Sequence, residues 1–238
     1  MSLRHLALLF TLPLAATALA PPAFALDAEE LVAKNLEARG GRERLAAVTS
    51  VHTVGTVRLG GSLEAKTEAW GLVPGAIRTE LSLQGMTAIQ AWDGKEAWMV
   101  QPFRGRKDPQ KLSDDDAKGL VEAADLVGPL VDYARKGNTI EYLGTEDVDG
   151  TDAHKLRVTL KNGDVQYRYL DPDHFLEIRV VTHRMVRGQE EVQTVDLGEY
   201  EKVDGLYFPF EVGRGHLDKM ELNGPVDSKM FGFPGGAR

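Results

Sequence analysis

The stretch that most constrains the fold of this chain covers residues 70–103, WGLVPGAIRTELSLQGMTAIQAWDGKEAWMVQPF. Residues 77–83 alternate apolar and polar side chains, which is the period of a half-buried strand. Gln84-Gly85 and Asp93-Gly94 are turn dipeptides. The second is typical of a two-residue type I′ hairpin, in which both turn residues have positive φ. The stretch therefore predicts four short antiparallel strands.

Strand patterns also occur on both sides of this stretch. Residues 51–59 and 62–70 predict a hairpin, and from residue 139 onward turn dipeptides recur about every 8–12 residues. None of the strands is long or apolar enough for a parallel sheet. We therefore predict a mainly β protein with a single curved antiparallel sheet, an unclosed half-barrel of about 11–12 strands. The chain has no Cys, so its stability does not depend on disulfides.

Residues 27–39 predict an amphipathic helix that covers part of this sheet. Asp27 and Glu30 have the spacing of a capping box, which satisfies free backbone N–H groups at a helix start. Gly40-Gly41 ends the helix, because glycine adopts the left-handed conformation without steric cost.

A second helical region interrupts the strands. Residues 104–111 are charged and predict a loop, and Ser113 then has the position of an N-cap before an acidic first turn. Helical spacing continues over 114–136, with a break at Gly128-Pro129, a restart with Pro at the first helical position, and an end at Gly137. We expect the two short helices to form a lid over the open face of the sheet.

The first 25 residues have the features of a secretory signal peptide. A short basic start precedes an apolar run over residues 6–20, and Ala23-Phe24-Ala25 fits the small-x-small cleavage rule. An uncleaved anchor is the alternative, but the run is too short for a membrane span. We predict cleavage after Ala25 and a soluble periplasmic protein of 238 − 25 = 213 residues. No linker divides residues 26–238, which we interpret as one domain.

Composition and motifs argue against several functional classes. Without Arg4, the mature chain has 27 basic and 36 acidic side chains, a formal charge of 27 − 36 = −9, which disfavours nucleic acid and anionic membrane surfaces as partners. The sequence contains no nucleophile elbow, metalloprotease helix or glycine-rich phosphate loop. Its histidines are scattered without the spacing of metal ligands. We therefore predict no catalytic residues, no metal, no cofactor and no enzymatic activity.

Three short motifs occur in order along the mature chain. The strand ending at Trp70 continues through Gly71-Leu72-Val73-Pro74 into the strand that opens at Ile77. Residues 92–98, WDGKEAW, are followed by Pro102-Phe103, and the chain closes with residues 226–234, VDSKMFGFP. Together with the predicted half-barrel, N-terminal helix and helical insertion, this order resembles the LolA/LolB-like family of periplasmic carriers that sort outer-membrane lipoproteins.

The resemblance implies a carrier that binds lipid, or the acyl chains of lipoproteins, in an apolar cavity and moves them between envelope membranes. Its partners would be a membrane transporter as donor and an outer-membrane acceptor. Carriers of the founding type have an arginine directly before the proline, where this chain has Val73, which leaves the cargo class open. A regulatory sensor of envelope stress that binds lipid or mislocalised lipoprotein is the alternative, and a β-domain with a plain core is a third.

The same interpretation assigns site residues. All three tryptophans lie within 70–103, where they either fill a core or line a cavity. The predicted lipid-binding cavity comprises Trp70, Ile77, Leu81, Leu83, Met86, Trp92, Trp98 and Met99. The predicted lid contacts are Leu31, Leu36, Leu120, Val127 and Leu130.

Overall fold

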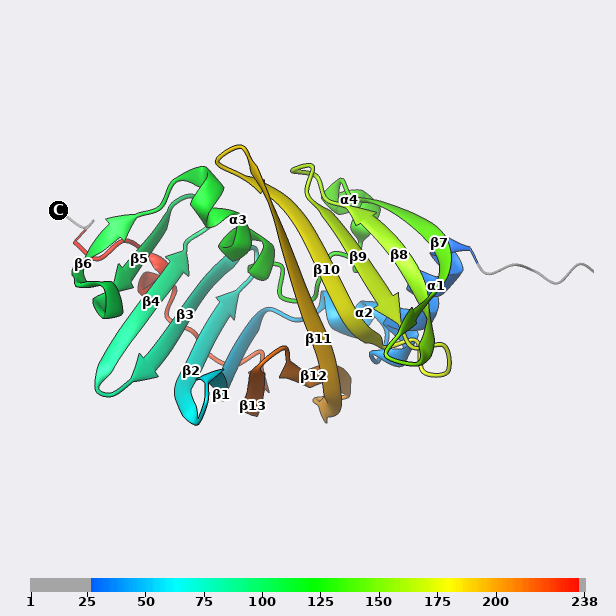
Figure 1. Cartoon of the computed structure of the whole chain (residues 1–238), viewed down its shortest axis with the longest axis horizontal. Helices are drawn as coiled ribbons and strands as arrows, with labels where there is room; N and C mark the ends of the chain where they lie inside the picture. The colour runs from blue at the N-terminus through cyan, green and yellow to red at the C-terminus, as the bar shows by residue number, and fades with distance from the viewer. Residues whose placement is uncertain (1–26, 236–238) are drawn as a thin grey trace, which may run out of the picture.

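A computed structural model describes residues 27–235 as one antiparallel sheet of 13 strands with helices on it (Figure 1). The predicted signal peptide and its cleavage site lie outside the described residues. The strand order is β6-β5-β4-β3-β2-β1-β13-β12-β11-β10-β9-β8-β7, so almost every strand pairs with its neighbours in sequence. The mainly β, unclosed sheet predicted from the sequence is confirmed. The strands are β1 (Ser50–Gly60), β2 (Leu63–Leu72), β3 (Ala76–Leu83), β4 (Met86–Trp92), β5 (Ala97–Gln101), β6 (Arg106–Lys111), β7 (Thr139–Val148), β8 (Thr151–Thr159), β9 (Val165–Leu170), β10 (Glu177–Val186), β11 (Gln189–Val203), β12 (Leu206–Val212) and β13 (Gly215–Leu222).

The strand that the sequence did not predict is β6, which occupies residues interpreted as a loop. It pairs with β5 at the edge of the sheet, with Lys111 opposite Trp98 and Gln110 opposite Met99. Pro109 and the surrounding charges suggested a loop, but an edge strand hydrogen-bonds on one side only and therefore tolerates both. The loop prediction for 104–111 was wrong for this reason.

The helices begin where their capping residues predict. The backbone N–H of Glu30 donates to the Asp27 carboxylate at the start of α1 (Ala28–Ala38), over a distance of 2.8 Å. Ser113 caps α3 (Asp114–Ala123) in the same way. A short helix, α2 (Arg42–Ala46), follows α1, and one-turn helices form at η1 (Pro102–Arg104) and η2 (Ser228–Phe231).

The second helix of the predicted lid is much shorter than expected. Turns replace a helix after Gly128-Pro129, and α4 covers only Tyr133–Lys136 before ending at Gly137 in the left-handed conformation. The proline therefore does not begin a helix, and this part of the prediction was wrong. Residues 125–132 are instead held by side chains: the Lys136 ammonium donates to the Asp125 carboxylate at 2.7 Å and to the Gly128 carbonyl at 2.8 Å.

The turn chemistry of the four-strand stretch also differs from the prediction at one position. Gln84 and Gly85 have φ of 50° and 77° between the paired residues Leu83 and Met86, as a type I′ turn requires. The turn after Trp92 has four residues rather than two, because Trp92 pairs with Ala97. The Asp93 carboxylate accepts hydrogen bonds from the backbone N–H groups of Lys95 and Glu96, both at 2.8 Å. The carboxylate thus stabilises this longer loop.

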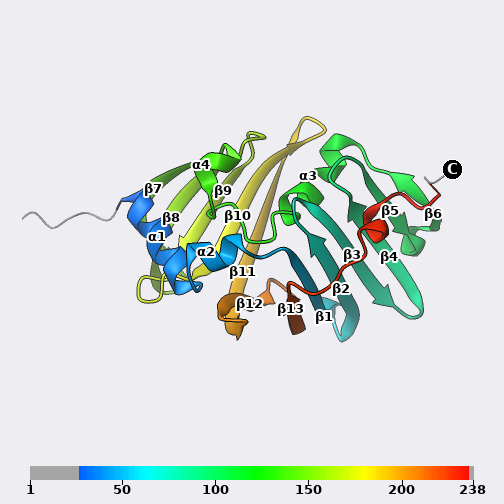
Figure 2. The same ribbon diagram turned by 180° about the vertical axis from the view of Figure 1, so that it is seen from behind.

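The α-helices of residues 27–235 lie on one face of the sheet, which we call the inner face. The largest core cluster joins α1 and α2 to it through buried apolar side chains, including Leu31, Leu36, Leu45, Leu156, Leu170, Leu206 and Phe208. A smaller cluster joins α3 to β3 and β5 through Ile77, Ala97, Ala117, Leu120 and Ala124. Figure 1 shows α3 between the β2–β5 strands and the β10–β11 hairpin, and Figure 2 shows α1 and α2 on the other half of the sheet.

The C-terminal segment packs against the opposite, outer face. The indole N–H of Trp98 donates to the carbonyl oxygen of Phe231 at 2.8 Å, and Phe233 contacts the same indole edge-on. The Arg78 guanidinium lies over this ring and donates to the Met230 carbonyl. In Figure 2 this segment crosses the β2–β5 strands and ends near β6. The closing motif of the sequence therefore anchors the chain end to the outer face.

Within residues 27–235, no helix is long and apolar enough to cross a membrane.

Candidate functional site: an apolar trough beside helix α3

The strand register shows which predicted cavity residues share a face. Directly paired residues project to the same side of a sheet, and neighbours along a strand alternate. Ile77 pairs with Trp92, Leu81 with Ala88, and Leu83 with Met86, while Gln90 pairs with Met99. Six of the eight predicted residues therefore lie together on the inner face: Ile77, Leu81, Leu83, Met86, Trp92 and Met99.

The register places Trp70 and Trp98 on the outer face instead. Trp70 pairs with Arg78, and Trp98 pairs with Ala91, each one residue out of phase with the inner-face row. Trp70 stacks on His52 with ring centroids 5.2 Å apart, and Trp98 is buried under Phe231. These two tryptophans are separated from the other predicted residues by the sheet itself, so the structure does not bring them into one cavity.

Helix α3 divides the inner-face row into a covered part and an open part. Ile77 is 8% exposed, because Ala117, Leu120 and Ala124 of α3 pack over it. Beyond the helix, Leu81, Leu83 and Met99 are only half-buried, and Met86 is 39% exposed. The structure therefore leaves a row of large apolar side chains accessible on the inner face of the sheet.

The open row continues across the sheet into a cavity of about 440 Å³. Thr67, the direct partner of Leu81, lines this cavity together with Val57 of β1. The rest of its lining is mixed: Val195, Val212 and Leu217 are apolar, whereas Gln193, Thr194, Arg214 and His216 are polar or charged. We use the term trough for Val57, Thr67, Leu81, Leu83, Met86, Met99, Val195, Val212 and Leu217.

The sequence prediction missed the half of the trough contributed by β1 and β11–β13. Val57, Val195, Val212 and Leu217 are scattered over the chain, and each is an ordinary apolar residue of an alternating strand. The signal for a strand is present at each position. Their convergence depends on strand order and register, which alternation alone does not determine.

The predicted lid residues have different environments. Leu31 and Leu36 of α1 and Leu130 are buried in the main core, where they contact the sheet directly. Leu120 belongs to the α3 cluster, and Val127 packs at the edge of the main core. Leu36 and Leu130 also form part of a second groove, of about 640 Å³, between α1 and residues 130–135. Its rim carries charged side chains, and the Arg42–Asp132 ion pair lies across it.

Polar contacts fasten α3 to β10 on the side away from the small core cluster. The Glu122 carboxylate forms an ion pair with Arg184 at 2.6 Å and accepts a hydrogen bond from the Gln166 amide. Nearer the start of the helix, the Asp116 carboxylate contacts the Arg187 guanidinium at 2.5 Å, and Lys118 donates to the Met185 carbonyl. One side of α3 is therefore held by apolar packing and the other side by these polar contacts. We use the term α3 latch for the polar contacts that Asp116, Lys118 and Glu122 make with β9 and with the end of β10.

Burial raises the pKa of Glu122 above its usual value, although Arg184 and Arg168 oppose the change. Near the helix start the pKa of Asp116 is lowered, by the Ser113 hydroxyl and then by Arg187. The two carboxylates of the latch therefore differ. Burial disfavours the charged form of Glu122, whereas hydrogen bonds favour the charged form of Asp116.

A buried ion pair continues from the latch towards the main core. Arg168 contacts Glu177 at 2.5 Å and donates to the Gln166 side chain at 2.7 Å. Burial works against the charge of Glu177, but the guanidinium groups of Arg168 and Arg39 outweigh it, so its pKa lies below the usual value. Breaking such a pair strongly destabilises a fold because one charge is left buried and uncompensated.

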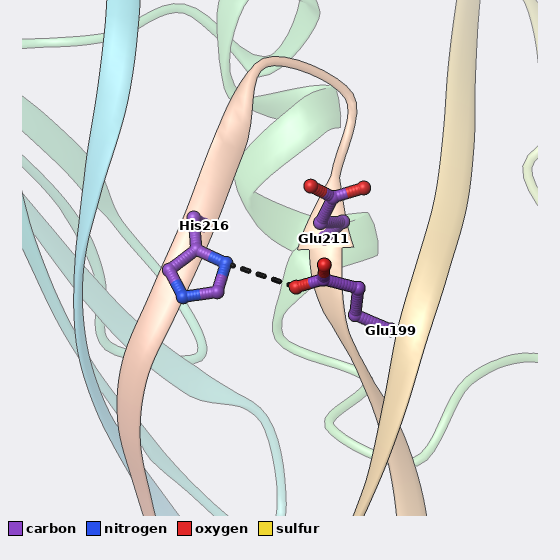
Figure 3. A group of neighbouring side chains, drawn as sticks. All are labelled: Glu199, Glu211 and His216. Atoms are coloured by element: carbon purple, nitrogen blue, oxygen red, sulfur yellow. Dashed lines mark ion pairs between the residues drawn. The ribbon is translucent and has the colours of Figure 1, made fainter.

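Among the residues that the structure describes, one group of possible metal ligands occurs on the surface. Glu199, Glu211 and His216 come from β11, β12 and β13, and their ligand atoms lie within 4.8 Å of one another (Figure 3). His216 Nδ1 is 3.4 Å from the Glu199 carboxylate. His216 and Glu211 are direct partners and share a face with Thr56, which is opposite to the face of Val57. Thr56 and His216 nevertheless line the 440 Å³ cavity, so the group lies at the edge of that cavity.

Comparisons with known proteins identify the fold. Neither a family model nor a curated protein matches the sequence. Among solved structures, a LolA superfamily protein from Nitrosomonas europaea matches with a TM-score of 0.53 and 13% identity, over 87% of this chain and 98% of the other. A putative outer membrane lipoprotein-sorting protein domain from Vibrio parahaemolyticus gives 0.52 and 15%, over 84% and 97%. A DUF1329 family protein from Desulfovibrio piger gives 0.51 and 12%, over 86% and 95%.

At these identities the likeness concerns the fold alone, and it extends over nearly the full length of each neighbour. The strand order, the helices on the inner face and the solved structures agree. This chain has the LolA-like fold, shared with outer membrane lipoprotein-sorting domains.

Proposed function

We propose that this protein is a periplasmic carrier that binds the acyl chains of a lipid or lipoprotein in the trough. The observation that carries the proposal is the row of Leu81, Leu83, Met86 and Met99, which lies on the inner face of the sheet yet is left accessible beside α3. Large apolar side chains on a concave surface next to a cavity are the usual features of a site for an apolar ligand. The LolA-like fold supports the same function.

Energetics favour an acyl chain as the ligand. Each buried methylene contributes about 0.8 kcal/mol, so a chain of about sixteen carbons gains on the order of 10 kcal/mol on leaving water. A carrier must also release its cargo. The α3 latch consists of a few ion pairs rather than a continuous core, so the helix can separate from β10 without unfolding the sheet. No reaction and no cofactor are part of this proposal.

Purification of the protein from its own periplasm, followed by mass spectrometry of co-purifying molecules, tests this function. We expect lipids or acylated peptides to co-purify and to displace a fluorescent fatty acid from the emptied protein. Absence of any acylated molecule, together with no binding of the fluorescent fatty acid, would contradict the proposal.

The periplasmic location requires removal of the predicted signal peptide. Intact-mass analysis of the exported protein should give a mature chain that begins at Leu26 and lacks residues 1–25. A mass that includes the apolar run of residues 6–20 would show that the chain keeps its N-terminal segment as an anchor.

A further inference from the structure

Strand β11 has a free edge inside the sheet. Its residues 189–196 pair with β10, and its residues 197–203 pair with β12 on the other side. Strand β12 ends at Val212, and β13 turns away after two pairs with it. Among residues 27–235, no strand therefore pairs with the second edge of β11 from Gln189 to Val195.

The direction of the free backbone groups follows from one hydrogen bond. The Asp196 carbonyl accepts from the Gly213 N–H at 2.8 Å, so the backbone groups of Asp196 point away from β10. In an antiparallel pair this direction alternates from residue to residue. The N–H and C=O groups of Glu190, Val192 and Thr194 must therefore also point to the free edge, whereas those of Gln193 and Val195 point to β10.

This free edge borders the trough. Gln193, Thr194 and Val195 form one wall of the 440 Å³ cavity, and Thr56, Val57 and Thr67 lie across from them. Exposed sheet edges are commonly protected by charged side chains. Here Glu190 and Glu191 protect the part near the hairpin, but the segment from Val192 to Val195 has no charge, and Val192 is 56% exposed.

We infer that this edge binds an extended peptide segment as an added β-strand. A row of free N–H and C=O groups is matched by another backbone strand lying about 4.8 Å away, because that strand supplies both donors and acceptors along its length. A hydrocarbon chain offers neither. The inference rests on the proposed function and deepens it: the cargo is a lipoprotein, its acyl chains lie in the trough, and the peptide that follows the acylated residue lies along β11.

Continuity of the two surfaces supports this occupant. Val195 projects from the free-edge strand into the cavity that also contains Val57 and Leu217, so a chain that leaves the trough passes directly to the edge. The phosphate and ester oxygens of a phospholipid can accept single hydrogen bonds, but a phospholipid has no chain of alternating donors and acceptors at strand spacing. A lipoprotein should therefore bind more tightly than a phospholipid with the same acyl chains.

The test compares synthetic probes on the mature protein. The probes are a short diacylated peptide of alternating apolar and polar residues, the same peptide without acyl chains, and a phospholipid with matched chains, each measured by displacement of a fluorescent fatty acid. We expect the diacylated peptide to bind about tenfold more tightly than the phospholipid, as one or two net hydrogen bonds would produce.

N-methylation of the peptide backbone gives the sharpest readout. Methylating alternate residues in one phase should reduce binding to the phospholipid level, and methylating the other phase should have little effect, because only every second residue of an added strand faces β11. Equal effects in both phases, or none in either, would overturn strand addition. If the phospholipid binds under those conditions, the carrier function still holds. If no acylated probe binds, the proposed function itself fails.

A protein variant provides an independent arm. Val192→Pro removes one free-edge N–H but leaves the β10 ladder intact, since that N–H points away from β10. Val192 is not among the residues that line the cavity, so the substitution should weaken the diacylated peptide several-fold and leave the phospholipid unchanged. The matched control Val192→Thr keeps the N–H and should bind both probes normally. A loss of phospholipid binding by Val192→Pro, or equal loss by both variants, would contradict a backbone contact at this position.

Discussion

The Glu122 carboxylate of α3 and the Arg184 guanidinium of β10 form an ion pair at 2.6 Å that fastens the helix across the inner face of the sheet. The helix is held on its other side by packing of Leu120 against Ile77 and its neighbours. If the apolar side acts as a hinge, α3 can move away from β10 only when the charged side separates. Under the proposed carrier function, the latch therefore limits how far the accessible row extends beneath α3 towards Ile77.

Removing the latch should make α3 more dynamic. We expect Arg184→Met to increase amide hydrogen exchange in residues 114–124 by about tenfold, with little change in β3 and β4, because local opening of a segment depends on the contacts it loses. Added ligand should slow exchange in the same residues. The matched control is Arg179→Met on the same strand, whose ion pairs with Asp149 and Asp196 are remote from α3. Identical exchange of α3 in both variants and the wild type would leave the latch without a role.

The pKa of Glu122 predicts a pH dependence of stability. Because burial raises this pKa above the usual value of 4.5, the folded state binds more protons than the unfolded state between the two values. The contribution of Glu122 to stability must therefore decrease as the pH rises through that window. We expect urea unfolding to show that the free energy of unfolding of Glu122→Gln increases relative to that of the wild type as the pH rises above 4.5. If the difference in the free energy of unfolding between Glu122→Gln and the wild type stayed constant or decreased over this pH range, burial would not disfavour the charged form of Glu122.

Trp98 is expected to stabilise the fold without taking part in binding. Trp98→Phe leaves the Phe231 carbonyl without its donor, which should cost about 1–3 kcal/mol in the free energy of unfolding. Binding of acylated probes should be unchanged, since the ring lies on the outer face. Trp70→Phe, at a partly buried position on the same face, should lose less stability. If a folded Trp98→Phe protein bound lipid more weakly, the lipid would have to contact the outer face, and the trough would not be its binding site.

Local chemistry made much of the fold predictable from the sequence. Capping residues such as Asp27 and Ser113 gave the helix starts, and turn dipeptides such as Gln84-Gly85 gave the hairpins, because each depends on contacts within a few residues. Strand β6 was missed because edge strands accept the charges and proline that elsewhere exclude a strand.

The site was less predictable because it depends on pairing. Trp98 is close in sequence to Trp92, but its partner is Ala91, so the two tryptophans project to opposite faces. The other wall of the trough comes from Val195 and Leu217, which only the strand order brings near Leu81. Alternation identifies a face within one strand, and register is needed to join the faces of distant strands.

The substitution Leu81→Glu decides whether the open inner-face row is a ligand surface or a filled core. Leu81 is a half-buried residue of the trough, so a carboxylate there remains in contact with water, whereas a charge in a packed interior costs several kcal/mol. Its neighbour on the outer face provides the control Ser82→Glu, and Ile77→Glu under α3 represents the packed core.

The measurement is binding of a fluorescent fatty acid and thermal melting on the same samples of these three variants. We predict that Leu81→Glu melts close to the wild type and loses binding, that Ser82→Glu keeps both, and that Ile77→Glu unfolds or melts far lower. A Leu81→Glu protein that melts as low as Ile77→Glu would show that the row is ordinary core. One that folds and binds the fatty acid normally would place the ligand away from the trough.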